Sequence, residues 1–149
     1  MFKLFTQLVF TLLAPALFAQ VNKELPLVDL KIQGHALKAE LAKDNDTRSI
    51  GLMNRFSLKP DHGMLFIFKE VGMVGMWMKN TYVPLSVAFI DEKGVILNIE
   101  NMKPQVLDTH STIAPALYAL EMKMGWFDSH GIKPGAKIEG LAKLGKATN

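Results

Sequence analysis

WMKNTYVPLSVAFIDEKGVILNIE, residues 77–100, contains the pattern that decides the fold. Two apolar runs, 85–90 and 95–100, flank the Asp-Glu-Lys-Gly segment at 91–94, which is typical of a β-hairpin turn. The segment 76–83 predicts a further strand, and Pro84 should interrupt its pairing because proline lacks the N–H that a sheet requires. The stretch therefore predicts a β-rich domain.

Short apolar runs on both sides of this stretch predict more strands. LPLVDLKIQGHALKAELA (25–42) alternates apolar and polar residues about a turn at Gln33-Gly34, as two half-buried strands do. GMLFIF (63–68) is apolar on both faces, which indicates a strand covered on both sides. ALYALEM (116–122) predicts another strand, with Tyr118, Leu120 and Met122 on one face and Leu117, Ala119 and Glu121 on the other.

Helical signals are fewer. TRSIGLMNRF (47–56) fits a helix of two to three turns, for which Asp44 or Asp46 can serve as the cap. GWFDSHGI indicates a turn or a short helical piece, and KPGAKIEG a last short strand. Seven or eight short strands with one or two short helices predict a mainly-β domain, a β-sandwich or small barrel, with a helix across one opening.

The first twenty residues differ from the rest. One lysine, an apolar run and then small residues are the layout of a secretory signal peptide, with cleavage expected after Ala19 and Ala16 as the second choice. The apolar part, residues 8–19, is shorter than the roughly 20 residues of a membrane span. The sequence therefore predicts an exported protein, periplasmic or extracellular, with residues 1–19 removed. Residues 20–149 would form a single domain, with a polar tail from about residue 141 and no membrane span.

Composition excludes several functions. The formal charge is +3, and it falls to +2 once the signal peptide with Lys3 is removed. No basic stripe of the kind that follows a phosphate backbone is present, so we expect no nucleic-acid partner. Cysteine is absent, which excludes disulfides, thiol catalysis and cysteine-ligated zinc.

The tryptophan segment has two interpretations from its residues alone. In a regular strand Trp77, Lys79 and Thr81 project from one side, giving an aromatic wall, a cation and a hydroxyl for a small polar or anionic ligand. Arg48 and Arg55 are seven residues apart, so a helix returns them to nearly the same side, where they would add cations.

The ordinary alternative is a structural network. In it, Lys79 is solvated and the arginines pair with carboxylates. Glu121, which lies among apolar residues, is the natural partner because a buried carboxylate needs one. The network and the ligand pocket can coexist.

A soft-metal site is the alternative function. Met73, Met76 and Met78 lie close together in the sequence, and methionine thioethers favour Cu(I). Alternation places Met76 and Met78 on the side opposite Trp77, so the indole would not cover an ion held there. Methionines also fill irregular core space, which is the simpler interpretation.

These same residues resemble a known family. Separated motifs in the same order, together spanning about residues 27–140, are similar to the bacterial and archaeal domain of unknown function 192. Two positions depart from the family pattern: Met76 stands where an aromatic is frequent, and Ser86 where aspartate is frequent. The resemblance implies a small β-rich domain that is often exported, and it supplies no reaction. The matching positions are Arg48, Gly51, Leu52, Met53, Arg55, Gly63, Met64, Leu65, Phe66, Trp77, Met78, Lys79, Asn80, Thr81, Pro84, Leu85, Phe89, Ile90 and Asp91.

No reaction is nominated by the sequence. Asp108, His110 and Ser111 are too close along one loop to form a triad with the histidine in the middle. We therefore expect an exported, non-enzymatic domain without a cofactor or metal that binds a small polar or anionic ligand or a peptide. In it, Glu121 would orient the cations and Asn80 would fix the turn before Pro84. The predicted ligand-binding residues are Arg48, Arg55, Trp77, Lys79, Asn80, Thr81 and Glu121.

Overall fold

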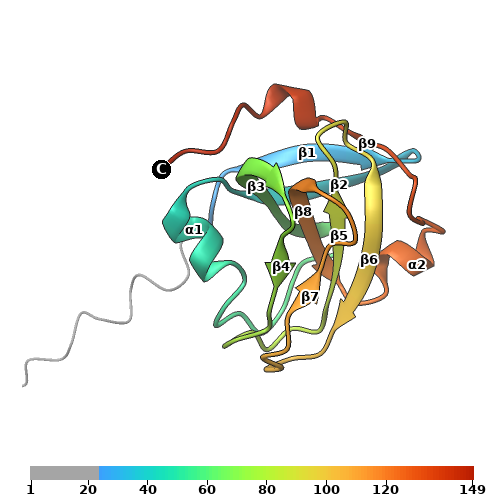
Figure 1. Cartoon of the computed structure of the whole chain (residues 1–149). Helices are drawn as coiled ribbons and strands as arrows, with labels where there is room; N and C mark the ends of the chain where they lie inside the picture. Colours follow the sequence, from blue (N-terminus) through green and yellow to red (C-terminus); the bar gives the residue numbers. More distant parts are fainter. Residues whose placement is uncertain (1–23) are drawn as a thin grey trace, which may run out of the picture.

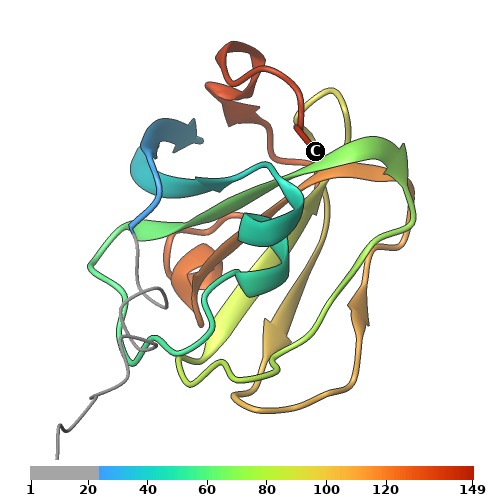
Figure 2. The ribbon, with the colours of Figure 1, turned by 90° about the vertical axis from the view of Figure 1, so that its left-hand side faces the viewer.

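The computed structural model describes residues 24–149, so the predicted signal peptide lies outside the described residues. One strongly curled sheet has the strand order β6-β5-β8-β3-β2-β1-β9, and β4 and β7 form a small second sheet beside it (Figures 1 and 2). This half-barrel confirms the predicted mainly-β class. The elements are β1 (Leu27–Ile32), β2 (His35–Ala42), α1 (Asn45–Ile50), β3 (His62–Gly72), β4 (Gly75–Met76), β5 (Leu85–Ile90), β6 (Ile96–Met102), β7 (His110–Ser111), β8 (Ala116–Lys123), α2 (Trp126–Ser129), β9 (Ile138–Glu139) and the 3-10 helix η2 (Leu141–Lys143).

Both hairpins lie where the sequence predicts them. The β1–β2 turn has φ of 49° at Gln33 and 86° at Gly34, the positive values that a tight two-residue hairpin turn requires. Between β5 and β6, the Asp91 carboxylate accepts the N–H groups of Lys93 at 2.9 Å and Val95 at 2.8 Å. Local backbone conformation thus fixes the first turn, and side-chain hydrogen bonds fix the second.

The pairing of β2 with β3 is parallel, whereas the other pairs among the described strands are antiparallel. Parallel neighbours need a crossover connection, because the chain must return to the starting edge before the second strand. Here the crossover is residues 43–61 and carries α1, which lies in front of the sheet in Figure 2.

α1 is shorter than predicted. Asp44 caps it, as expected: its carboxylate accepts the Thr47 N–H at 2.8 Å, and this hydrogen bond lowers the pKa of Asp44. The helix ends at Ile50 because Gly51 adopts a φ of 51°, outside the helical region. The prediction of a longer helix bearing Arg48 and Arg55 on one side is therefore wrong.

The curled sheet has an apolar core on each face. In β8, Leu120 and Met122 join the cluster inside the curl with Trp126 and Phe127 of α2. Ala119 joins the second cluster, which lies under the crossover and the 73–84 segment. This matches the predicted alternation along β8.

The curl is fastened where the two ends of the sheet approach each other. The Ile96 N–H donates to the Ala136 carbonyl at 2.9 Å, and the Ile138 N–H donates to Gly94 at 2.8 Å. These bonds join the segment leading into β9 to the β5–β6 hairpin, so the inner cluster is enclosed.

The C-terminal tail is more ordered than its polar composition indicates. Leu141 is only 7% exposed and belongs to the inner cluster. The Thr148 N–H donates to the Lys43 carbonyl at 2.8 Å, next to the start of α1. The residues after β9 therefore pack back onto the half-barrel.

Candidate functional site

The tryptophan segment is not the predicted strand. β4 ends at Met76, and the chain turns at Asn80, whose φ is 52°. Thr81 is buried and its hydroxyl donates to the Lys79 carbonyl at 3.0 Å, so it does not join Trp77 and Lys79 on an exposed strand face. The predicted strand geometry is therefore wrong at Thr81, although Thr81 and Trp77 line the same small hollow.

Trp77 and Lys79 nevertheless lie together. The Lys79 ammonium is 5.3 Å from the centroid of the Trp77 ring, a cation–π geometry. Strand pairing ends at Met76, but residues 77–79 continue the alternation: Trp77 and Lys79 are exposed, and Met78 is buried. Asn80 is exposed, and its carbonyl accepts the Asn54 N–H at 2.8 Å, which ties this loop to the crossover.

Beneath Trp77 lies a small hollow, here called the Trp77 depression, with a volume of about 30 Å³. It brings together four of the seven predicted site residues, from the crossover, the 77–84 loop and β8. Its wall residues include Arg48, Gly51, Phe66, Trp77, Thr81 and Glu121.

Glu121 is 4% exposed, and burial raises its pKa to about 8. The expected pairing of Glu121 with an arginine is wrong: the ion pairs of residues 24–149 do not include it. Neither a hydrogen bond nor a cation lowers its pKa, because burial is the acting cause. Near neutral pH the carboxyl is therefore protonated.

Arg48 is held by other acceptors. One terminal nitrogen, Nη1, donates to the Lys43 carbonyl at 2.5 Å and to the Ile67 carbonyl at 3.0 Å, and Nη2 donates to Asn45 Oδ1 at 2.8 Å. These contacts anchor the guanidinium between α1 and β3. Arg48 thus has a structural role at the edge of the Trp77 depression.

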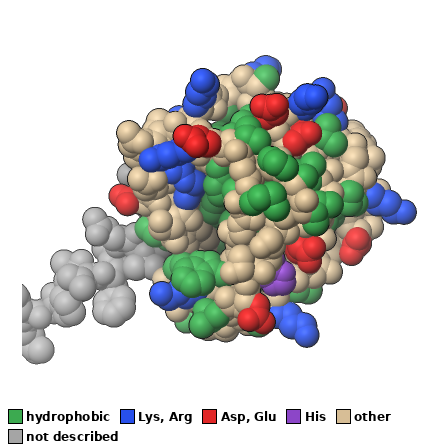
Figure 3. All heavy atoms as spheres, viewed as in Figure 1, with side chains coloured by type: hydrophobic (Ala, Val, Ile, Leu, Met, Phe, Trp, Pro, Cys, Tyr) green, Lys and Arg blue, Asp and Glu red, His purple; other side chains and the backbone are tan. Residues whose placement is uncertain are grey.

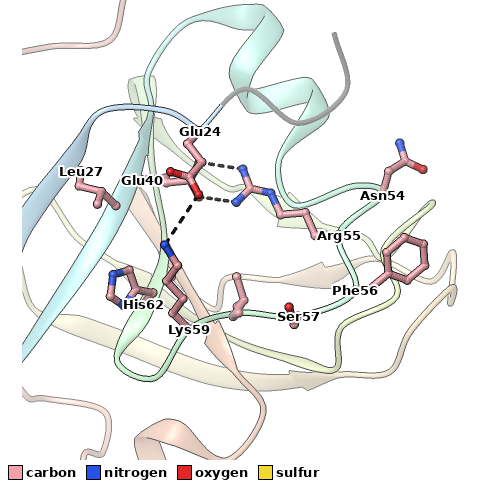
Figure 4. A pocket seen from close by; sticks show the side chains of 11 residues that line it. Glu24, Leu27, Glu40, Asn54, Arg55, Phe56, Ser57, Lys59 and His62 are labelled. Carbon is pink, nitrogen blue, oxygen red and sulfur yellow. Dashed lines mark hydrogen bonds and ion pairs between the residues drawn. The ribbon is translucent and has the colours of Figure 1, made fainter. Parts of the chain in front are cut away.

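Arg55 lies elsewhere, in a cavity of about 340 Å³ here called the Arg55 cavity (Figure 4). The cavity lies at the end of the crossover, against the starts of β1 and β3. In Figure 4, Arg55 and Lys59 point toward the two glutamates, while Phe56 lies on the opposite side. Its lining residues are Glu24, Leu27, Glu40, Asn54, Arg55, Phe56, Ser57, Leu58, Lys59, His62 and Gly63.

Arg55 forms a two-pronged ion pair with Glu40. Nη1 donates to Oε1, and Nη2 donates to Oε2 at 2.7 Å, while Oε2 also accepts the Leu25 N–H at 2.9 Å. The side chains are 17% and 9% exposed, respectively, so water screens the pair little. By contrast, Lys59 and Glu24 are 3.9 Å apart and largely exposed.

Sequence reasoning missed Glu40, Lys59 and His62. Glu40 stands in a strand that alternates, at a position on the same face as Met64 and Glu121 of the neighbouring strands. The apolar positions of that strand are Leu37, Ala39 and Leu41, so the alternation puts Glu40 on the polar side and gives no signal that it is buried and needs a partner. Identifying Arg55 as that partner requires the parallel β2–β3 register.

The methionines lie in different environments. Met73 is 66% exposed, Met76 is partly buried and Met78 is fully buried in the second cluster, which lies under the crossover. Among the described residues, no group of three or more His, Asp or Glu side chains could hold a metal ion. Copper binding by these thioethers stays a prediction of the sequence.

The surface shown in Figure 3 carries lysine and arginine side chains at scattered positions, with hydrophobic side chains gathered between them. No continuous basic stripe crosses this face. In the part of the chain from residue 24 onward, no helix is both long and apolar enough to traverse a bilayer.

Curl, strand order and the two hollows define a mainly-β half-barrel domain with polar sites on its crossover side. The family model DUF192, described as "Uncharacterized ACR", matches residues 28–140, and the chain belongs to this family. The resemblance drawn from the sequence motifs is thereby confirmed.

Two solved structures are similar. A proposed transcription regulator from Sinorhizobium meliloti is 39% identical, with a TM-score of 0.76 over 80% of this chain and 97% of that one. A protein of unknown function from Novosphingobium aromaticivorans is 32% identical, with a TM-score of 0.75 over 78% of this chain and 86% of that one. No curated protein sequence matches the chain.

Proposed function

We propose that this domain binds a small polar or anionic ligand, and that the ligand occupies the Arg55 cavity. The observation that supports this proposal is a cavity of about 340 Å³ that is lined by the Arg55 side chain. Pockets for small ligands start at roughly 300 Å³, whereas the Trp77 depression is about a tenth of that size. The sequence analysis placed this ligand against Trp77 and Lys79; we now propose that it binds beside Arg55 instead.

Arg55 can bind an anion while it stays paired with Glu40. A guanidinium has five N–H groups, and two of them donate to Glu40. The Glu40 carboxylate is satisfied by these bonds and by the Leu25 N–H. Lys59 adds an exposed ammonium at the rim, and Phe56 adds an apolar surface that is 80% exposed. A carboxylate on a short carbon chain matches this lining.

The test is thermal shift of the full chain with acetate, succinate, glycine, phosphate and sulfate. A ligand that binds only the folded state raises the melting temperature, and the rise grows with the logarithm of the ligand concentration once this exceeds the Kd. Lys59→Met should reduce the shift several-fold without unfolding the protein, because Lys59 is 73% exposed. Lys93→Met, an exposed lysine of the β5–β6 turn, is the matched control. An unaltered shift in Lys59→Met, or no shift with all five probes, would rule out this site.

DNA is included in the same assay because one structural neighbour is described as a proposed transcription regulator. We expect no salt-dependent binding of a duplex, since the formal charge is only +3 and the basic residues are dispersed. Binding that weakens steeply with added salt would instead favour a nucleic-acid role.

Export is also part of the proposal. The apolar run and small residues before position 20 support cleavage and a periplasmic or extracellular site of action. N-terminal sequencing of the protein recovered from the producing cell tests it. A chain that retains Met1 and stays in the cytoplasmic fraction would contradict export.

A further inference from the structure

A buried acid, Glu121, lies in the wall of the Trp77 depression. Glu121 is 4% exposed, lies opposite Met64 and Val87 in the sheet, and forms none of the ion pairs of residues 24–149. Buried polar groups are normally hydrogen-bonded, and an unpaired carboxyl is costly to keep. Because it lines an open hollow, this carboxyl is available to a ligand.

The depression has room for one small polar head group. Its volume of about 30 Å³ exceeds the roughly 10–15 Å³ that a water molecule needs. An ammonium group is close to water in size. Trp77 forms the outer wall and is 49% exposed, so the rest of a ligand can lie along the indole.

We propose that the Trp77 depression binds a primary alkylammonium group, with the Glu121 carboxylate as its ion-pair partner and the Trp77 indole against its methylene chain. This site is separate from the Arg55 cavity and does not depend on a ligand there. The alkylammonium is either a free amine or a lysine side chain of a peptide.

The chemistry of the walls favours a cation. A carboxylate pairs with an ammonium, and an indole face attracts one, as the Lys79 ammonium 5.3 Å from the Trp77 ring already shows. The strands beside Glu121 present Met64 and Val87, which are uncharged.

Two cations lie nearby on other elements. Three N–H groups of Arg48 already donate to the Lys43 and Ile67 carbonyls and to Asn45, so this guanidinium is engaged with other acceptors. Lys79 is the built-in competitor, because its ammonium occupies the same aromatic surface.

Binding is coupled to proton release. Burial raises the pKa of Glu121 to about 8, so at neutral pH the free site holds a protonated carboxyl. When the alkylammonium enters, the O–H bond of the carboxyl breaks, its proton goes to water, and a carboxylate–ammonium pair remains. Affinity should therefore rise about tenfold per pH unit below the pKa and level off above it. An anionic ligand would show the opposite trend.

The experiment is calorimetric titration of the full chain with n-butylammonium, up to about 50 mM, at several pH values between about 6 and 9. We expect affinity to rise with pH, and well below pH 8 about one proton to be released on binding, measured in two buffers of different ionisation enthalpy. A second titration uses a peptide with one central lysine and blocked termini. Tighter binding of the peptide or of butylammonium shows whether the site prefers a lysine side chain or a free amine. Butyrate is the probe of opposite charge.

Variants make the result specific. Glu121→Gln keeps the shape and removes the charge, so butylammonium affinity should fall at least tenfold. Glu100→Gln, the same change two strands away on the same face, should not alter it. Trp77→Leu should weaken binding at an exposed position that tolerates substitution, and Lys79→Met should strengthen it.

Three outcomes would overturn the inference: no butylammonium binding, butylammonium binding that survives in Glu121→Gln without pH dependence, or preferential binding of butyrate. A negative result here would not contradict the proposed ligand site in the Arg55 cavity, because Lys59→Met tests that site separately.

Discussion

Glu121 makes the stability of this half-barrel depend on pH in an unusual direction. Its pKa is about 8 in the folded protein against 4.5 for a free glutamate, so between these values the folded state holds more protons than the unfolded state. Stability is therefore fully present below about pH 4.5 and is lost as pH rises toward 8. The shift corresponds to about 5 kcal/mol, at about 1.4 kcal/mol per pH unit in the middle of the window.

The comparison that isolates this effect is wild type against Glu121→Gln, because glutamine has the same shape and does not titrate. Urea unfolding of both chains should give similar free energies near pH 5. Toward pH 8 the wild type should become less stable than the variant by several kcal/mol. Glu100→Gln controls for the loss of a glutamate on the same sheet face. Parallel pH profiles for wild type and Glu121→Gln would refute the claim that burial keeps this carboxyl neutral.

The other expected outcomes concern stability and are read from urea midpoints. Arg55→Met should destabilise the protein by about 3 kcal/mol because it strands the buried Glu40 carboxylate, and adding Glu40→Leu should recover much of the loss. Gly63→Ala should cost more than about 3 kcal/mol or prevent folding, since its Cβ would lie 2.1 Å from the Glu121 carbonyl oxygen. Asp44→Ala should cost about 1 kcal/mol through loss of the helix cap, and an unchanged midpoint would contradict that role.

Features that depend on neighbouring residues were predictable from the sequence. The hairpin turns at Gln33-Gly34 and at Asp91 follow from local backbone and side-chain chemistry. The two faces of β8 follow from its alternation, and that alternation also indicated that Glu121 is buried among apolar side chains.

Features that depend on distant residues were not predictable in this way. Glu40 meets Arg55 because β2 runs parallel to β3, and one chain gives no signal for that register. The helix bearing Arg48 was expected to continue, but Gly51 ends it, and this divides the predicted arginine pair between two hollows. The expectation that Trp77 and Lys79 lie on the same side is confirmed, but not for the stated reason, because the strand ends before both residues.

The parallel pairing of β2 with β3 has a further consequence for how this architecture can diversify. The connection that this pairing requires, residues 43–61, supplies side chains to both hollows. The two strands that it joins, β2 and β3, pair directly with each other. Arg55 and Lys59 of the Arg55 cavity both lie on this connection, whereas Glu121 and Trp77 of the Trp77 depression lie outside it. Exchanging residues 43–61 between relatives should therefore change the ligand preference of the Arg55 cavity while the half-barrel remains the same.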